Sequence, residues 1–169
     1  SVIAEGWRQG RLLLAGDAAH QTPPFLGQGM CAAIRDASNL AWKLDAVLRG
    51  RAQDELLDTY ESERSPHVRA FIELAVRLGD IIQTTDPQAA RERDARFQAG
   101  QPEIFQFPAP RLGPGVWHGD HAPVAQVFPQ PRLADGRRLD AATGAGFALI
   151  TATPALLAGL DAGTRARWA

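Results

Sequence analysis

The sequence predicts an α/β fold that is mainly helical, and three features lead to this prediction. A short apolar run over residues 11–15 precedes a loop rich in glycine and proline, and a stripe of apolar residues with helical spacing follows that loop. A second helical pattern begins near residue 54. Seven prolines between residues 101 and 131 then leave little room for regular structure.

The first strand and helix are expected on either side of that glycine-rich loop. Residues 11–15 (RLLLA) end at Gly16 and are typical of a buried strand, and the loop then runs from Asp17 to Gly29. Spacings of three and four predict one apolar stripe of a helix, and Gly50 ends that helix. Its members are Ile34, Ala37, Ala41, Leu44 and Leu48. Strand, glycine-rich turn and helix in this order are typical of an α/β ligand site.

A second helix is expected to begin at Asp54, which is a suitable N-cap, with Leu57 and Tyr60 on its apolar face. Pro66 lacks a backbone donor, so it should kink or restart the helix, with Ser65 as the new cap. The apolar stripe then continues through Val68, Phe71, Ala75, Leu78 and Ile82.

The rest of the chain is less regular. Residues 87–97 are helix-prone but heavily charged, as in a solvated helix, and residues 101–131 are typical of an extended connector. A strand over 146–151 and a helix over 156–168 are expected to follow. The predicted division is therefore 1–100, 101–131 and 132–169.

Composition excludes several classes of function. The 18 basic and 19 acidic residues leave a net charge of -1, which provides no overall field to attract nucleic acid or an anionic membrane. Cys31 is the only cysteine, so a cytoplasmic setting is expected, without an internal disulfide or a cysteine zinc cluster. No apolar stretch is long enough to span a bilayer. The chain begins at Ser1 without a visible signal peptide and is expected to be an internal piece of a longer protein.

The chemistry-bearing segment runs from Gly16 to Leu44. Asp17 follows the expected strand, where its carboxylate can accept hydrogen bonds from sugar-like hydroxyls. The Gly27–Gly29 turn opens a helix and exposes unpaired N–H groups at the positive end of the helix dipole. Together these features suit a ligand with a polyol chain and an anionic or carbonyl-bearing head group, such as a flavin.

The segment GDAAHQTPPFLGQGMCAAIRDASNLAWKL resembles the second flavin-binding motif of the FAD-dependent aromatic hydroxylases, the para-hydroxybenzoate-hydroxylase-like (class A) flavoprotein monooxygenases. Residues 39–44 and 57–64 are similar to the 3-(3-hydroxyphenyl)propionate and phenol hydroxylase branch. Residues 112–115 and 139–147 look like the entry to that family's thioredoxin-like domain. The resemblance implies an α/β fragment: the C-terminal part of a Rossmann-like FAD-binding domain and the truncated start of a thioredoxin-like domain, without the GxGxxG fingerprint.

The resemblance also implies a set of flavin contacts. Asp17 would bind the ribityl hydroxyls, and the N–H groups of Met30 and Cys31 would face the flavin O2 and N1. Many relatives carry Asn where this chain has Cys31, so a side-chain amide contact is lost there. The complete set is Gly16, Asp17, Pro24, Gly27, Gln28, Gly29, Met30 and Cys31. None of them is an evident acid–base catalyst.

The implied activity is that of an FAD- and NAD(P)H-dependent monooxygenase that uses O2 to hydroxylate a phenolic compound. The chain alone is expected to be inactive, and its exposed helix faces would favour a homo-oligomer. Two alternatives stay open. One is another flavoprotein, such as a halogenase or an epoxidase, and the other is a non-enzymatic helical module that associates without flavin.

Several other polar residues have two interpretations. His20 could be a catalytic base, but a structural histidine within the loop is the favoured interpretation. Cys31 could be a reactive thiol at a helix N-terminus, although small-residue packing is favoured. Arg35 and Asp36 either lie near the flavin or form a solvated ion pair.

Two further groups are expected to have no role in catalysis. Glu61 and Arg64 have the spacing of a helix-surface ion pair. His118, Asp120 and His121 offer only three metal-like ligands, so a metal site is disfavoured there.

Overall fold

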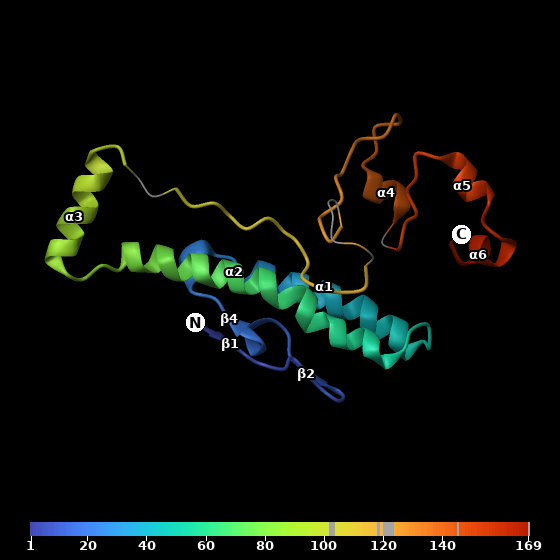
Figure 1. Ribbon diagram of the computed structural model, residues 1–169, viewed down its shortest axis with the longest axis horizontal. Coiled ribbons are helices and arrows are strands. Elements are labelled where there is room, and N and C mark those ends of the chain that lie inside the picture. Colours follow the sequence, from blue (N-terminus) through green and yellow to red (C-terminus); the bar gives the residue numbers. More distant parts are fainter. Residues whose placement is uncertain (102–103, 118, 120–123, 145, 169) are drawn as a thin grey trace. The chain divides into compact units, whose positions relative to one another are not determined.

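Figure 1 shows a computed structural model of the chain, which describes residues 1–101, 104–117, 119, 124–144 and 146–168. The chain divides into two compact units, Ser1–Val127 and Phe128–Ala169. The architecture is mainly helical with small sheets, which confirms the coarse fold prediction.

Four two-residue strands form two small antiparallel ladders near the N-terminus. β1 (Val2–Ile3) pairs with β4 (His20–Gln21), and β2 (Arg8–Gln9) pairs with β3 (Leu12–Leu13). The prediction of a buried strand over residues 11–15 was wrong, because only two of these residues pair and Leu12 is 72% exposed. Among the described residues, β2 and β3 pair only with each other across a tight turn, so each is an edge strand there.

The glycine-rich loop contains two short 3-10 turns, η1 (Gly16–Ala18) and η2 (Pro24–Leu26), and then opens into α1 (Gly29–Leu48). The boundaries of α1 agree with the prediction, but most of the predicted apolar stripe lies outside the buried face, and of its leucines only Leu44 packs against the core. Ile34 and Leu48 are 56% and 79% exposed. The buried residues of α1 are Ala32, Asp36, Asn39, Leu40 and Lys43. This face is buried because its polar side chains pair with those of the next long helix.

That next helix, α2 (Thr59–Ile82), follows a third 3-10 turn, η3 (Asp54–Asp58). The expected cap at Asp54 was wrong, because Asp54 lies within η3 and its carboxylate pairs with Arg8. The expected restart at Pro66 was also wrong, since α2 continues through it. A proline inside a helix removes one hydrogen bond and crowds the preceding turn, but this local cost does not end α2. Leu57 and Tyr60 are buried, as predicted.

The core of the first unit lies where α1 and α2 run antiparallel beside the N-terminal strands (Figure 1). It comprises Trp7, Ala19, Ala32, Leu40, Leu57, Tyr60, Val68 and Ile72. Trp7 is fully buried, and its ring lies 5.5 Å from each of the rings of His20 and Tyr60, measured between centroids. This packing holds the glycine-rich loop against the helix pair.

The remainder of the first unit includes α3 (Pro87–Gln98), which Asp86 caps by accepting a hydrogen bond from the Ala89 N–H at 2.7 Å. No residue of α3 is buried, as expected for a solvated helix. The following segment is more than an extended connector. The Gly113 N–H donates to the Glu63 carbonyl at 2.8 Å, so this part of the segment docks on α2.

The second unit contains three short helices, α4 (Leu139–Thr143), α5 (Pro154–Ala158) and α6 (Ala162–Trp168). The expected strand over 146–151 was wrong, since none of these residues is in a strand. The expected single helix over 156–168 is instead two helices, separated by a break at Gly159–Asp161. Across the described part of the chain, no helix has both the length and the apolar character needed to cross a membrane.

Candidate functional site

The glycine at the start of the candidate site is required by geometry. Gly16 has a φ of +58°, a left-handed conformation that favours glycine. A Cβ atom added there would lie 2.9 Å from the Cβ of Ala33 on α1, which is closer than two carbon atoms pack. The turn carrying Asp17 can therefore approach α1 only because residue 16 has no side chain.

A buried carboxylate ties this turn to the helix pair. Asp36 on α1 is fully buried and accepts hydrogen bonds from the Gly16 N–H at 3.3 Å and the Arg64 Nε at 2.9 Å. Its Oδ2 also lies 2.6 Å from the His20 Nε2. Of the two interpretations of Arg35 and Asp36, the solvated ion pair was wrong for Asp36, whose partners come from the loop and from α2. His20 is 1% exposed, as expected of a structural histidine.

Asp17 itself points outward from the turn that Asp36 holds against α1. Its side chain is exposed, and the described residues provide it with no hydrogen bond or ion pair. It lines a small hollow together with Val2, Ala4, Ala18, Ala19, His20 and Gln21. The backbone is thus fixed while the carboxylate stays available to accept hydrogen bonds from hydroxyl groups.

The N-terminus of α1 is the second open feature of the site. Gly27 ends η2 with a φ of +61°, and no side chain caps α1 at Gln28. The first helical hydrogen bond runs from the Ala32 N–H to the Gln28 carbonyl at 2.9 Å, so the preceding N–H groups lie outside the helical ladder. A Cβ added at Gly29 would meet nothing within 4 Å. This end of the helix can therefore receive an electron-rich ligand edge.

A second buried network lies further along the helix pair, and the sequence analysis did not predict it. The Glu63 Oε2 accepts hydrogen bonds from the Asn39 Nδ2 and the Lys43 Nζ, each at 2.7 Å. Lys43 also donates to the Thr59 Oγ1 at 2.6 Å. Burial lowers the pKa of Lys43, although the ion pair with Glu63 opposes that shift. The four-residue spacing of Asn39 and Lys43 was the signal that could have revealed this shared face.

The predicted surface pair of Glu61 and Arg64 was wrong. Arg64 is 3% exposed and pairs with Asp36. The Glu61 carboxylate instead accepts hydrogen bonds from the backbone N–H groups of Gly6 at 3.3 Å and Trp7 at 2.7 Å. Each of the two side chains serves a different tertiary contact, which spacing along one helix cannot predict.

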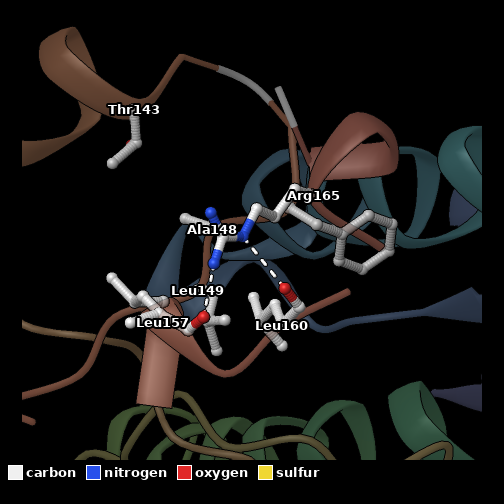
Figure 2. A pocket seen from close by; sticks show the side chains of 8 residues that line it. Thr143, Ala148, Leu149, Leu157, Leu160 and Arg165 are labelled. Atoms are coloured by element: carbon white, nitrogen blue, oxygen red, sulfur yellow. Dashed lines mark hydrogen bonds between the residues drawn. The ribbon is translucent and has the colours of Figure 1, made fainter. Parts of the chain in front are cut away.

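A larger hollow in the second unit lacks the features of a reactive site (Figure 2). Apolar residues such as Leu149, Leu157 and Leu160 line most of it, and Arg165 is its only charged side chain among the described residues. The Arg165 guanidinium donates to the Leu160 carbonyl at 3.0 Å and to the Ala158 carbonyl. Arg165 thus serves to cap a helix end.

No metal site is found in the part of the chain that the structure describes. His118, Asp120 and His121, the disfavoured metal ligands, lie outside the described residues. Cys31 is a free, half-buried thiol.

Comparison with known proteins shows what this chain is similar to. Residues 1–75 match the family described as an FAD binding domain. A probable NADH-specific resorcinol 4-hydroxylase of Rhodococcus jostii (strain RHA1) is 44% identical over 98% of this chain and 31% of its own length. The 3-(3-hydroxy-phenyl)propionate/3-hydroxycinnamic acid hydroxylase of Mycolicibacterium gilvum (strain PYR-GCK) is 41% identical over 99% of this chain and 33% of its own length.

The chain is similar to FAD-dependent aromatic hydroxylases over part of their length. Among solved structures, the OxyS anhydrotetracycline hydroxylase from Streptomyces rimosus is 33% identical, with a TM-score of 0.59 over 81% of this chain and 29% of that protein. This chain therefore spans about a third of the length of its hydroxylase relatives. The family resemblance seen in the GDAAH-to-NLAWKL segment is confirmed.

Proposed function

We propose that this chain forms part of an FAD- and NAD(P)H-dependent monooxygenase that hydroxylates a phenolic compound with O2. The proposal rests on one observation. Two groups that lack partners among the described residues lie on the same loop, which Asp36 holds in place. Asp17 presents an exposed carboxylate, and the N-terminus of α1 presents N–H groups beyond the helical ladder. The names of the relatives, a resorcinol hydroxylase and a hydroxyphenylpropionate hydroxylase, support the phenolic substrate class.

The residues present fit the ribityl chain and the ring edge of a flavin. We assign the ribityl hydroxyls to Asp17, because a carboxylate free of other partners accepts hydrogen bonds from them most strongly. The N–H groups of Met30 and Cys31 would face the flavin O2 and N1, where the helix dipole favours negative charge. When bound, FAD supplies the redox chemistry with O2, and the protein supplies orientation.

The other assigned residues act through the backbone. Gly27, Gln28 and Gly29 form the turn that opens α1, and Pro24 is proposed to lie near the flavin ring. Gly16 serves the same site by allowing its turn to lie close to α1. Asp36 is a positioning residue, because it holds the Gly16 N–H and the His20 ring while Asp17 faces outward.

We also propose that residues 1–100 form the flavin part, 101–131 a connector, and 132–169 the start of a thioredoxin-like domain. Only the sequence pattern over residues 112–115 and 139–147 supports the thioredoxin-like assignment. A homo-oligomer and a cytoplasmic setting belong to the same proposal. Exposed apolar side chains on α1, such as Met30 at 73% exposure, support self-association.

The test compares FAD binding by the protein expressed from its complete gene with binding by an Asp17→Ala variant. Loss of a charged hydrogen-bond acceptor should weaken FAD binding at least roughly tenfold, as followed by flavin fluorescence. Asp80→Ala is the matched control, because Asp80 is an exposed aspartate on α2. An unchanged FAD dissociation constant in Asp17→Ala would sink the assignment of Asp17.

A second variant tests the opening of α1. Gly29→Val adds a branched side chain where the backbone is proposed to approach the ring, so flavin occupancy should fall more than helix content. Circular dichroism and the flavin absorbance of the purified variant measure the two effects separately. Normal occupancy and turnover would show that the backbone at Gly29 does not approach the ring.

A further inference from the structure

A cavity of about 470 Å³ lies between α1, α2 and the segment that follows α3. Three arginines line it: Arg35 from α1, Arg64 from α2 and Arg111 from the docked segment. Its other described lining residues are uncharged, so no carboxylate faces these guanidinium groups across the cavity. None of the residues assigned to the flavin lines this cavity, so the inference does not rest on the proposed function.

One of the three arginines has a donor left unused inside the protein. Arg64 is 3% exposed, and its Nε donates to Asp36. Its Nη2 is buried, and no described residue accepts a hydrogen bond from it. A buried donor without a partner is costly, and a charged one more so, so an acceptor brought close to this nitrogen would be favoured.

The segment that carries Arg111 is held in place by specific contacts. The Leu112 N–H donates to the Ala125 carbonyl at 2.9 Å, and the Gly113 N–H donates to the Glu63 carbonyl at 2.8 Å. The Ser62 Oγ also donates to the Pro114 carbonyl at 2.7 Å. Arg111 is therefore next to a stretch of backbone that hydrogen bonds hold in place. This stretch forms one wall of the cavity.

The neighbouring histidine reports the positive charge of this region. His67 has a pKa lowered to about 4, first by burial and then by the charges of Arg64 and Arg35, while Asp36 opposes the shift. Two guanidinium groups and one carboxylate shift the pKa of His67, so the charges that act on it are net positive. A ligand that carries two negative charges would complement it better than one that carries a single charge.

A second unused group indicates what else the ligand carries. Asn39 also lines the cavity, and its Oδ1 is buried and accepts no hydrogen bond from the described residues. Its Nδ2 donates to Glu63, which fixes the amide orientation because a carboxylate only accepts. An organic hydroxyl or amino group could donate to the Oδ1, whereas the dianionic phosphate group of a monoester has no proton to donate.

We propose that this cavity binds a phosphate ester that bears hydroxyl or amino groups, such as a nucleotide, with its phosphate on Arg35, Arg64 and Arg111. Guanidinium groups match phosphate oxygens with paired, charge-assisted hydrogen bonds. A volume of about 470 Å³ falls in the range of small-molecule sites. Asn39 accepts a hydrogen bond from the organic part of the ligand.

The test is isothermal titration of the purified 169-residue chain with AMP, inorganic phosphate, adenosine and acetate at low ionic strength. AMP should bind most tightly. The double variant Arg35→Ala/Arg111→Ala should weaken AMP binding at least about tenfold, since it removes two charge-assisted contacts at exposed positions. Arg77→Ala, which removes an exposed arginine of α2 outside the cavity, should leave the AMP dissociation constant unchanged.

A second variant keeps the proposal falsifiable if the double variant does not fold. Ser38→Glu places a negative charge at an exposed lining position and should also abolish AMP binding, while circular dichroism confirms the fold. Adenosine or acetate binding as tightly as AMP would overturn the phosphate assignment. If inorganic phosphate bound as tightly as AMP, the proposal that the ligand is a phosphate ester would be overturned. An equal loss in Arg77→Ala, or no AMP binding by the wild-type chain, would overturn the site.

Discussion

The two units of this chain use helices in opposite ways. In Ser1–Val127, two helices of 20 and 24 residues bury both apolar side chains and a set of charged ones. In Phe128–Ala169, the helices are five to seven residues long, and none of the unit's described residues is buried. Helices this short are marginal without packing. Both units therefore contain sequence that forms helices. Among the described residues, only the first unit has a buried interior.

The interior of the first unit contains buried ion pairs that determine how α1 and α2 pack against each other. Asp36 pairs with Arg64, and Lys43 pairs with Glu63, at the interface of α1 and α2. A one-residue slip between the helices would leave these charges buried without partners. Buried ion pairs contribute little net stability compared with apolar residues, but breaking one is costly. We infer that the pairs fix the register of the helices and hence the position of the loop that carries Asp17.

The largest effect is expected from breaking the second network. Glu63→Ala removes the acceptor of both Lys43 and Asn39 and leaves a buried ammonium group without a counter-charge. The free energy of unfolding should fall by about 3–5 kcal/mol, as measured by urea denaturation. Glu73→Ala, an exposed position on the same helix, is the control and should change it by less than about 0.5 kcal/mol. Equal effects of the two variants would contradict the comparison.

The next effect depends on pH and is confined to the first unit. The pKa of His67 is lowered to about 4, so between about pH 6.5 and pH 4 the unfolded chain binds a proton that the folded chain does not. Stability should therefore decrease as the pH falls through this window, by at most about 3 kcal/mol. His67→Leu should remove this component, because both ring nitrogens lack partners among the described residues. Parallel stability curves for the two proteins would refute the assignment.

Two glycines, one in each unit, sharpen the comparison at a smaller scale. A Cβ added at Gly115 would lie 2.1 Å from the Glu63 Oε1, whereas one added at Gly146 would meet nothing within 4 Å. Gly115→Ala should destabilise the protein by about 1–3 kcal/mol, since the docked segment must move away from α2. Gly146→Ala should change the midpoint of unfolding hardly at all. Thermal unfolding of both variants tests the pair, and a neutral Gly115→Ala would contradict the close approach.

The sequence predicted what depends on local chemistry. Gly29 and Gly50 bracket α1 because glycine acts on its own stretch of backbone, and the charged α3 was recognised from its composition alone. The flavin loop was recognised by its motif, while its eight contact residues stay predictions. The resemblance to FAD-dependent aromatic hydroxylases was also identified from that segment.

The buried face of α1 could not be predicted in the same way. A hydrophobic stripe selects Ile34 and Leu48, yet the face that packs on α2 carries Asp36, Asn39 and Lys43. The partners of these side chains lie 16 to 28 residues away in the sequence. A polar residue is buried only where such a partner meets it, and periodicity within one helix contains no information about that partner.

The smallest effect is expected from an arginine in the second unit. The guanidinium of Arg165 donates to two carbonyls, as in a well-formed cap, but its surroundings are exposed to solvent. Water can replace both hydrogen bonds, so Arg165→Ala should change the free energy of unfolding by less than about 0.5 kcal/mol. Arg64→Ala removes an arginine with one ion pair in the buried interior and should cost several times more, because Asp36 then loses its counter-charge. Urea denaturation of the two variants measures this contrast directly. If Arg165→Ala were as destabilising as Arg64→Ala, the second unit would have an interior of its own, and burial would not distinguish the two units.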